Sequence, residues 1–278
     1  MSKLSFLGAV LILALAGIVA AQDTKPAPAT PPNANEPVPS IVKRKENATP
    51  APVVTKTSNA RLVIPETDFR FGYAPQNAKI AHNYWLKNEG PDSLRLIDVR
   101  PGCGCTKAPL TKRILAAGDS TNVELVFSTG MYSSKTQKSA TVVADANQTV
   151  PNLTFSAFPT KNVDSLQPFI VIPPLVNLDS LKDAGKSGSV EVRVKNTSTS
   201  PINLKLVSTP DKWFTVEVPG GSIAPGSDEV ISVRFTSDIA DTVLTKSFTI
   251  EASDSALTRY SVPIQKAMRW GPTTSSTP

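Results

Sequence analysis

An internal repeat constrains the fold of this chain more than any other feature of its sequence. Residues 63–142 match residues 171–250 without a gap, at an offset of 108, so that Val63 corresponds to Val171. The clearest matches are 63–65 with 171–173, 86–88 with 194–196, 117–119 with 225–227, 123–127 with 231–235, and 139–142 with 247–250. Repetition at a fixed offset indicates two copies of one structural unit. The sequence therefore predicts two domains, at residues 58–160 and 161–267.

The matched stretches have the alternating pattern of strands with one buried face. In the second copy, Val190, Val192 and Val194 alternate with charged residues, which is the period of two that is typical of β-structure. The 25 Pro and only three Met of the chain also favour short strands and turns over helices. The sequence therefore predicts an all-β fold class of two tandem immunoglobulin-like β-sandwich domains, with about seven strands in each.

The N-terminal residues have the pattern of an export signal. Lys3 precedes the apolar residues 4–20, and the small residues 19–21 match a signal-peptidase site before Gln22. We therefore expect residues 1–21 to be a signal peptide, with an uncleaved membrane anchor as the alternative. After cleavage we expect no membrane span, because no later stretch has the apolar length that a span needs. The expected location is outside the cytoplasm: the periplasm, the cell surface or the secreted fraction.

Two further segments have too few apolar residues to build a core. Residues 22–57 contain eight prolines and no aromatic residue, which predicts a disordered, Pro-rich linker. Residues 268–278 are expected to form a short tail. The net charge of +6 is spread over 29 basic and 23 acidic residues, so no dense basic stripe indicates a nucleic-acid partner.

Several motifs of the first copy occur in an order that resembles a known family. They are F-R-F-G at 69–72, W-L-K-N-E-G at 85–90, C-G-C-T at 103–106, A-G-D at 117–119 and the strand at 123–127. In this order they resemble the bacterial exported domain-of-unknown-function family 1573, an immunoglobulin-like domain related to the hydin-like (ASH) and major-sperm-protein folds. The resemblance covers about residues 60–158 and implies an exported, non-enzymatic module. The second copy matches the scaffold alone, with Asp179-Ser180 in place of Phe-Gly and with Asp211 and Trp213 in place of the cysteines.

Cys103 and Cys105 are the only cysteines, and Gly104 separates them. Three states remain open for the pair: a disulfide, two packed thiols, or a site for a soft metal such as copper(I). Gly104 would allow the unusual backbone angles of so short a ring. Because a disulfide here closes almost no loop, it would add little stability, so in that state the pair would be a local staple or a redox pair. The second copy is expected to form the same strands without cysteines, so the fold does not require them.

The sequence contains no conventional catalytic machinery. His82 is the sole histidine, and with Tyr84 and Leu86 it falls on the face that we expect to be buried. No G-x-S-x-G or H-E-x-x-H pattern is present, and two thiolates alone would leave a zinc site half filled. We therefore expect no enzyme activity, no cofactor and no metal site.

Two tryptophans are the candidates for a contact surface. Trp85 falls on the outward face of its strand, and Trp213 lies in the loop that replaces the cysteines. Exposed Trp is enriched in binding sites, but cover by the other domain or the linker explains Trp85 equally well, and a place in the core explains Trp213. The sequence predicts a binding or structural module of the cell envelope with a protein or glycan partner. The alternative is a thiol-redox or copper-handling protein that uses Cys103 and Cys105.

Overall fold

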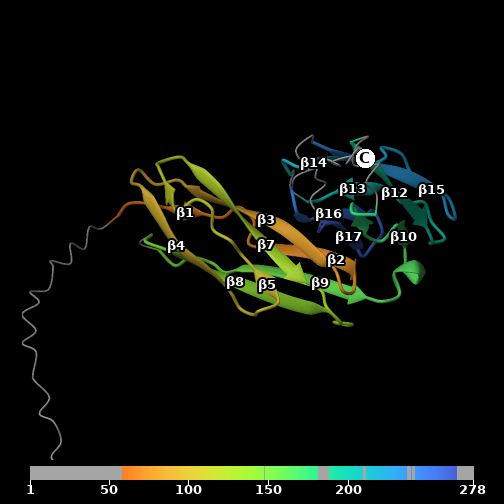
Figure 1. Cartoon of the computed structure of the whole chain (residues 1–278), viewed down its shortest axis with the longest axis horizontal. Coiled ribbons are helices and arrows are strands. Elements are labelled where there is room, and N and C mark those ends of the chain that lie inside the picture. Colours follow the sequence, from red (N-terminus) through yellow and green to blue (C-terminus); the bar gives the residue numbers. More distant parts are fainter. Residues whose placement is uncertain are drawn as a thin grey trace, which may run out of the picture. The chain divides into compact units, whose positions relative to one another are not determined.

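A computed structural model describes residues 58–146, 148–180, 188–208, 211–236, 239 and 242–267. The expected signal peptide, Pro-rich linker and C-terminal tail lie outside the described residues. Within the described ranges the secondary structure is almost entirely strands, with a short 3-10 helix η1 (Val163–Ser165) (Figure 1). None of the described residues belongs to a helix long and apolar enough to span a bilayer.

The first half of the described chain, residues 58–160, forms two facing layers of strands. Its strands are β1 (Leu62–Val63), β2 (Asp68–Pro75), β3 (Lys79–Asn88), β4 (Leu94–Pro101), β5 (Thr106–Lys107), β6 (Ile114–Leu115), β7 (Ser120–Ser128), β8 (Thr136–Ala144) and β9 (Leu153–Thr160). One layer has the order β1-β3-β7-β5, and the other contains β2-β9-β8-β4-β6. The pairs are antiparallel except β2 with β9, which is parallel.

The second half, residues 161–267, repeats this arrangement. Its strands are β10 (Phe169–Ile172), β11 (Val176–Asn177), β12 (Ser189–Asn196), β13 (Leu204–Leu206), β14 (Phe214–Glu217), β15 (Asp228–Phe235), β16 (Leu244–Ala252) and β17 (Arg259–Lys266). One layer has the order β10-β12-β15-β14, and the other contains β13-β16-β17 with β11 beside β17. The structure confirms the predicted all-β, immunoglobulin-like fold class.

The offset of 108 also holds for individual hydrogen bonds. Asn88 is fully buried, and its Nδ2 donates to the carbonyls of Asp92 at 2.7 Å and Leu115 at 3.0 Å. Its counterpart Asn196 is also fully buried, and its Nδ2 donates to the carbonyls of Ser200 at 2.8 Å and Ile223 at 2.9 Å. The acceptors are thus related by the same offset as the donors. The L-x-N motif supplies a buried amide that holds the β3–β4 and β6–β7 turns together.

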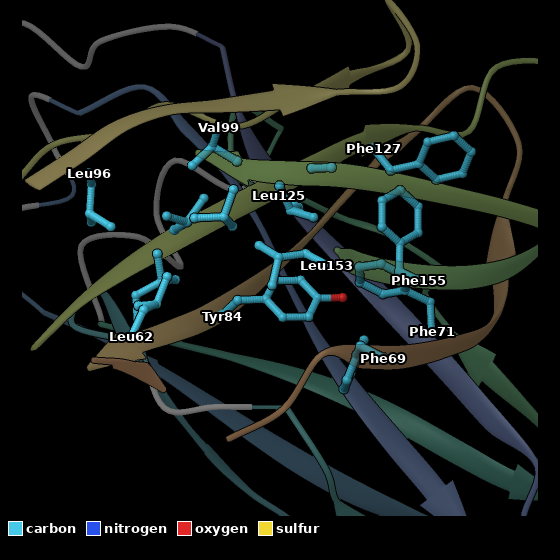
Figure 2. Close-up of a cluster of buried hydrophobic side chains, with 14 of the residues drawn as sticks. Leu62, Phe69, Phe71, Tyr84, Leu96, Val99, Leu125, Phe127, Leu153 and Phe155 are labelled. Atoms are coloured by element: carbon cyan, nitrogen blue, oxygen red, sulfur yellow. The ribbon is translucent and has the colours of Figure 1, made fainter. Parts of the chain in front are cut away.

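Each half has its own core between its two layers. Figure 2 shows the side chains of Phe71, Phe127 and Phe155 gathered in the first core, where ring centroids lie 5.5 Å (Phe71 to Phe155) and 5.3 Å (Phe127 to Phe155) apart. In the second half the valines of β12 are buried and the charged residues between them are exposed, as predicted. A large apolar side chain stabilises the fold by roughly 1.5–3 kcal/mol when it is fully buried.

The two halves are joined through β2, which the sequence did not predict. β2 lies between β9 of its own half and β17 of the second half, so one nine-stranded sheet runs through both halves. Gly72 sits at an irregularity of β2 with φ +68°, and a Cβ there would lie 2.2 Å from the carbonyl oxygen of Arg259. The Phe-Gly motif therefore provides the close approach that this junction needs. The two halves accordingly belong to one compact unit.

Candidate binding cleft

The two tryptophans selected from the sequence line one cleft of about 770 Å³. We call it the tryptophan cleft. Its lining residues come from the strands β3, β7 and β16, from the loop after β5, and from the loop before β14. They are Asn83, Trp85, Pro109, Thr111, Asn122, Glu124, Asp211, Lys212, Trp213 and Lys246.

The floor of the cleft is the outward face of β3 and β7. Because side chains alternate along a strand, burial of His82, Tyr84 and Leu86 turns Asn83 and Trp85 outward. Trp85 is 48% exposed. Across the sheet, Nδ2 of Asn122 donates to Oδ1 of Asn83 at 3.0 Å, which leaves the Nδ2 group of Asn83 and Oδ1 of Asn122 for a ligand.

The opposite wall is the loop before β14. Trp213 is half-buried, packs on the second core and carries the ammonium of Lys212 above its ring at 4.7 Å. Oδ1 of Asp211 accepts the backbone N–H of Trp213 at 2.9 Å. The two roles weighed for Trp213, core residue and surface residue, are therefore combined in one side chain.

A partly buried ion pair network connects this wall to the floor. Nζ of Lys246 on β16 contacts Glu124 of β7 and lies 3.1 Å from Asp211. Burial alone lowers the pKa of Lys246, but Glu124 and Asp211 together raise it above its ordinary value. Because Lys212 adds a second cation, the charged side chains of the cleft balance to about zero at neutral pH.

Cys103 and Cys105 form a disulfide with a Cα–Cα distance of 5.3 Å. Both residues are half-buried, and the hydroxyl of Thr106 lies 3.5 Å from Sγ of Cys103. Gly104, which could have supplied unusual backbone angles, is not among the described glycines with positive φ. The disulfide does not line the tryptophan cleft, so the structure keeps the two sets of candidate residues apart.

The second half builds the same loop without a disulfide. The N–H of Ser128 donates to the carbonyl of Cys105 at 2.9 Å, and at the same offset the N–H of Thr236 donates to the carbonyl of Trp213 at 2.9 Å. At the position of Cys103, the carboxylate of Asp211 caps the loop through Trp213 N–H. A carboxylate hydrogen bond thus occupies the place of the S–S bond.

His82 is a core residue. Its ring stacks on Phe69 with centroids 3.6 Å apart, and its Nε2 lies 2.9 Å from a carboxylate oxygen of Glu66. The ring is 3% exposed. Among the described residues there is no group of three or more potential metal-ligating side chains.

Sequence reasoning missed the polar residues of the cleft. Asn83 could have been predicted, because alternation along the strand places it on the same face as Trp85. Glu124, Asp211 and Lys246 could not have been predicted as cleft residues. Their contacts depend on the shared nine-stranded sheet, which the repeat does not predict.

Comparison with known proteins found one family model that matches the first half. A search of curated proteins gave no match. A solved protein of unknown function from Porphyromonas gingivalis W83 is 10% identical, covering 74% of this chain and 99% of that chain, with a TM-score of 0.31. The ASH/PapD-like domain 7 of human CEP192 is 10% identical, covering 40% and 92%, with a TM-score of 0.32. The E. coli chaperone DraB is 10% identical, covering 73% and 97%, with a TM-score of 0.29.

These TM-scores are low, so the three structures support no inference about function. The family model is more informative, because it matches residues 62–158 and these residues carry the Phe-Gly, L-x-N-x-G and C-G-C-T motifs. The described β1 to β9 occupy the same span. Residues 62–158 of this chain therefore match the model of the DUF1573 family, proteins of unknown function.

Proposed function

We propose that this protein is an exported, non-enzymatic binding module that holds a bacterial cell-envelope glycan in the tryptophan cleft. The observation that carries the proposal is the convergence of Trp85 and Trp213, which lie 128 positions apart in the sequence, on one cleft. Concave sites lined by aromatic rings and a few placed polar groups are typical ligand sites.

The chemistry of the lining favours a neutral glycan. A flat indole ring, such as the half-exposed Trp85, can stack on the apolar C–H face of a sugar ring. The free amide groups of Asn83 and Asn122 can donate to and accept from sugar hydroxyls. Because the charged residues of the cleft balance, a strongly charged ligand would gain little from electrostatic attraction.

A protein partner would instead use main-chain groups of β3 beside the cleft. β1 pairs only with Lys87 and Asn88 of β3, so the edge of β3 from Asn83 to Leu86 has no partner strand among the described residues. An extended peptide can add to such an edge through main-chain hydrogen bonds, and these do not depend on the indole rings. The two partner classes therefore differ in their response to loss of the tryptophans.

The test measures binding of the secreted protein to purified bacterial sacculi and to neutral oligosaccharides. Binding to a separate fraction of envelope proteins is measured in parallel. Trp85→Ala and Trp213→Ala are each expected to weaken glycan binding at least tenfold, which corresponds to about 1.4 kcal/mol. Ile97→Ala removes a side chain that is 44% exposed outside the cleft and serves as the control. Binding to the protein fraction alone, unchanged by both Trp substitutions, would instead identify a protein partner at the edge of β3.

A second candidate function is thiol-redox exchange, and the half-buried disulfide between Cys103 and Cys105 is the observation that favours it. A dithiol reductant would give two electrons and two protons, breaking the S–S bond into two thiols and forming its own disulfide. Titration of the protein in glutathione buffers tests this. Reversible reduction near the potential of the exported compartment would support redox exchange, whereas a bond that stays oxidised through that range would exclude it. Copper handling would need the reduced pair, because the disulfide carries no thiolate.

A further inference from the structure

We propose a second binding site, for a small aromatic or branched-chain monocarboxylate, in a pocket of about 360 Å³ beside the junction of β2 and β17. We call it the junction pocket. Its defining residues are Arg70, Tyr73, Lys135, Phe158, Leu257 and Arg259. It shares no lining residue with the tryptophan cleft, so its occupancy does not depend on the proposed glycan site.

The charges around the junction pocket favour an anionic ligand. Three of its lining side chains are cationic, and none of its lining residues is Asp or Glu. Nε of Arg259 lies 2.6 Å from the carboxylate of Glu251, and Nη2 of Arg70 lies 3.7 Å from it. One carboxylate is thus shared by two guanidinium groups and neutralises only one of their two positive charges. Lys135 is exposed and has no ion pair among the described residues, so the pocket retains a positive charge for a carboxylate.

The floor of the junction pocket is apolar and aromatic. The rings of Tyr73 on β2 and Phe158 on β9 lie 5.6 Å apart in a tilted arrangement. Phe158 is 40% exposed, although aromatic residues at such positions are normally covered. These two rings can take a third ring in offset contact, which is the geometry that aromatic groups prefer.

The third wall of the junction pocket contains a residue with an unfavourable backbone conformation. Leu257, in the turn between β16 and β17, has φ +48° and a side chain that is 47% exposed. The left-handed region is costly for a leucine, and an exposed leucine gains no burial in return. Asp254 fixes this turn, because its carboxylate accepts the N–H and hydroxyl of Thr258 and its carbonyl accepts the N–H of Leu257. Strain at an exposed apolar residue beside a pocket is consistent with a binding role.

The size of the junction pocket selects among apolar anions. A volume of about 360 Å³ is near the lower end of the range for small-molecule sites. The space suits one ring or a short branched chain with its carboxylate, and not a long acyl chain. The expected ligand places its apolar group between Phe158 and Leu257, and its carboxylate at Arg70 and Lys135.

The test uses 3-phenylpropionate as the probe and 3-phenylpropanol as its uncharged counterpart, in calorimetric titrations of the secreted protein. We expect the carboxylate to bind at least tenfold more tightly than the alcohol, and binding to weaken as salt rises. The double variant Arg70→Gln/Lys135→Gln should lose at least tenfold in affinity. Lys107→Gln, at an exposed lysine outside the pocket, and Trp85→Ala should bind as the wild type does.

A further variant separates a binding role from a structural one. Leu257→Gly relieves the positive φ, so Tm should not fall, while affinity for 3-phenylpropionate should decrease at least threefold. Equal binding of the alcohol and the carboxylate, or unchanged affinity in the Arg70/Lys135 variant, would overturn the proposal. Tenfold tighter binding of decanoate, or of a peptide that ends in Phe, than of 3-phenylpropionate would also overturn it, because each probe represents a different class of ligand.

Discussion

At positions 103 and 211 the two halves hold the same loop by different bonds. The first half uses the disulfide of Cys103 with Cys105, and the second half uses the carboxylate of Asp211 on the N–H of Trp213. Both loops accept the same backbone hydrogen bond, from Ser128 at the end of β7 in the first half and from Thr236 just after β15 in the second. The disulfide is therefore replaceable as a structural element, and its stabilising effect is expected to be small because it closes a very short loop.

Removal of both thiols tests this at the level of stability. Cys103→Ser with Cys105→Ser is expected to lower the free energy of unfolding by about 1.5 kcal/mol, from the entropy of a loop of three residues. Cys103→Asp with Cys105→Ser should recover part of this loss, because an aspartate there can cap the loop as Asp211 does. Urea titrations followed by circular dichroism measure both changes. A loss above about 4 kcal/mol would show that the disulfide is essential to the fold.

The buried amides of Asn88 and Asn196 occupy equivalent positions of the two halves. Either residue changed to Ala should destabilise the protein by about 3 kcal/mol, because several buried carbonyl and N–H groups lose their partner. Asn203→Ala changes an exposed asparagine and should stay within about 0.5 kcal/mol of the wild type. Equal effects of the three substitutions in urea titrations would contradict the assigned role of the two buried amides.

At the scale of strands, the sequence predicted the repeated elements and missed how the halves connect. Alternation of Val190, Val192 and Val194 identified β12 and its buried face, because a local pattern determines which side of a strand is apolar. The parallel pairing of β2 with β17 had no such signal. The sequence does not show that Gly72 lies against Arg259, so this glycine could equally have been a turn residue. For the same reason, Trp85 was predicted to be outward while its proximity to Lys246 was not.

Gly72 is the most sensitive residue of this junction. Gly72→Ala should lower the free energy of unfolding by at least about 3 kcal/mol, because the new Cβ would clash with the Arg259 backbone and because φ is positive. Gly220→Ala is the matched control, since Gly220 has open space around it and no positive φ. Thermal and urea unfolding measure both variants. A Gly72→Ala protein as stable as the control would mean that β2 and β17 are not held together in solution.

At the scale of the whole molecule, buried groups of both halves make stability depend on alkaline pH. Burial raises the pKa of Tyr84 in the first core and of Tyr260 in the second, and Lys246 also has a raised pKa. Each group is protonated in the folded state at a pH where the unfolded chain has begun to lose that proton. The stability they contribute is therefore complete below about pH 10 and decreases as pH rises above it.

Urea titrations between pH 7 and pH 11.5 test this dependence. The free energy of unfolding should change little up to about pH 9.5 from these groups and then fall steadily. Tyr84→Phe should have a smaller decrease above pH 10, although it loses the hydrogen bond that Tyr84 donates to the Thr154 carbonyl at 2.6 Å. Identical slopes for the variant and the wild type would show that Tyr84 ionises as an exposed tyrosine does.

The central claim is that Trp85 and Trp213, from opposite halves, bind one ligand in one cleft. The most direct measurement is a double-mutant cycle of Trp85→Ala and Trp213→Ala for affinity to purified sacculi or to the best neutral oligosaccharide. Residues that contact one ligand in a shared site are expected to be coupled by about 0.5 kcal/mol or more. We predict a large loss in each single variant and a double loss that differs from their sum. Affinity unchanged in both single variants would contradict the account.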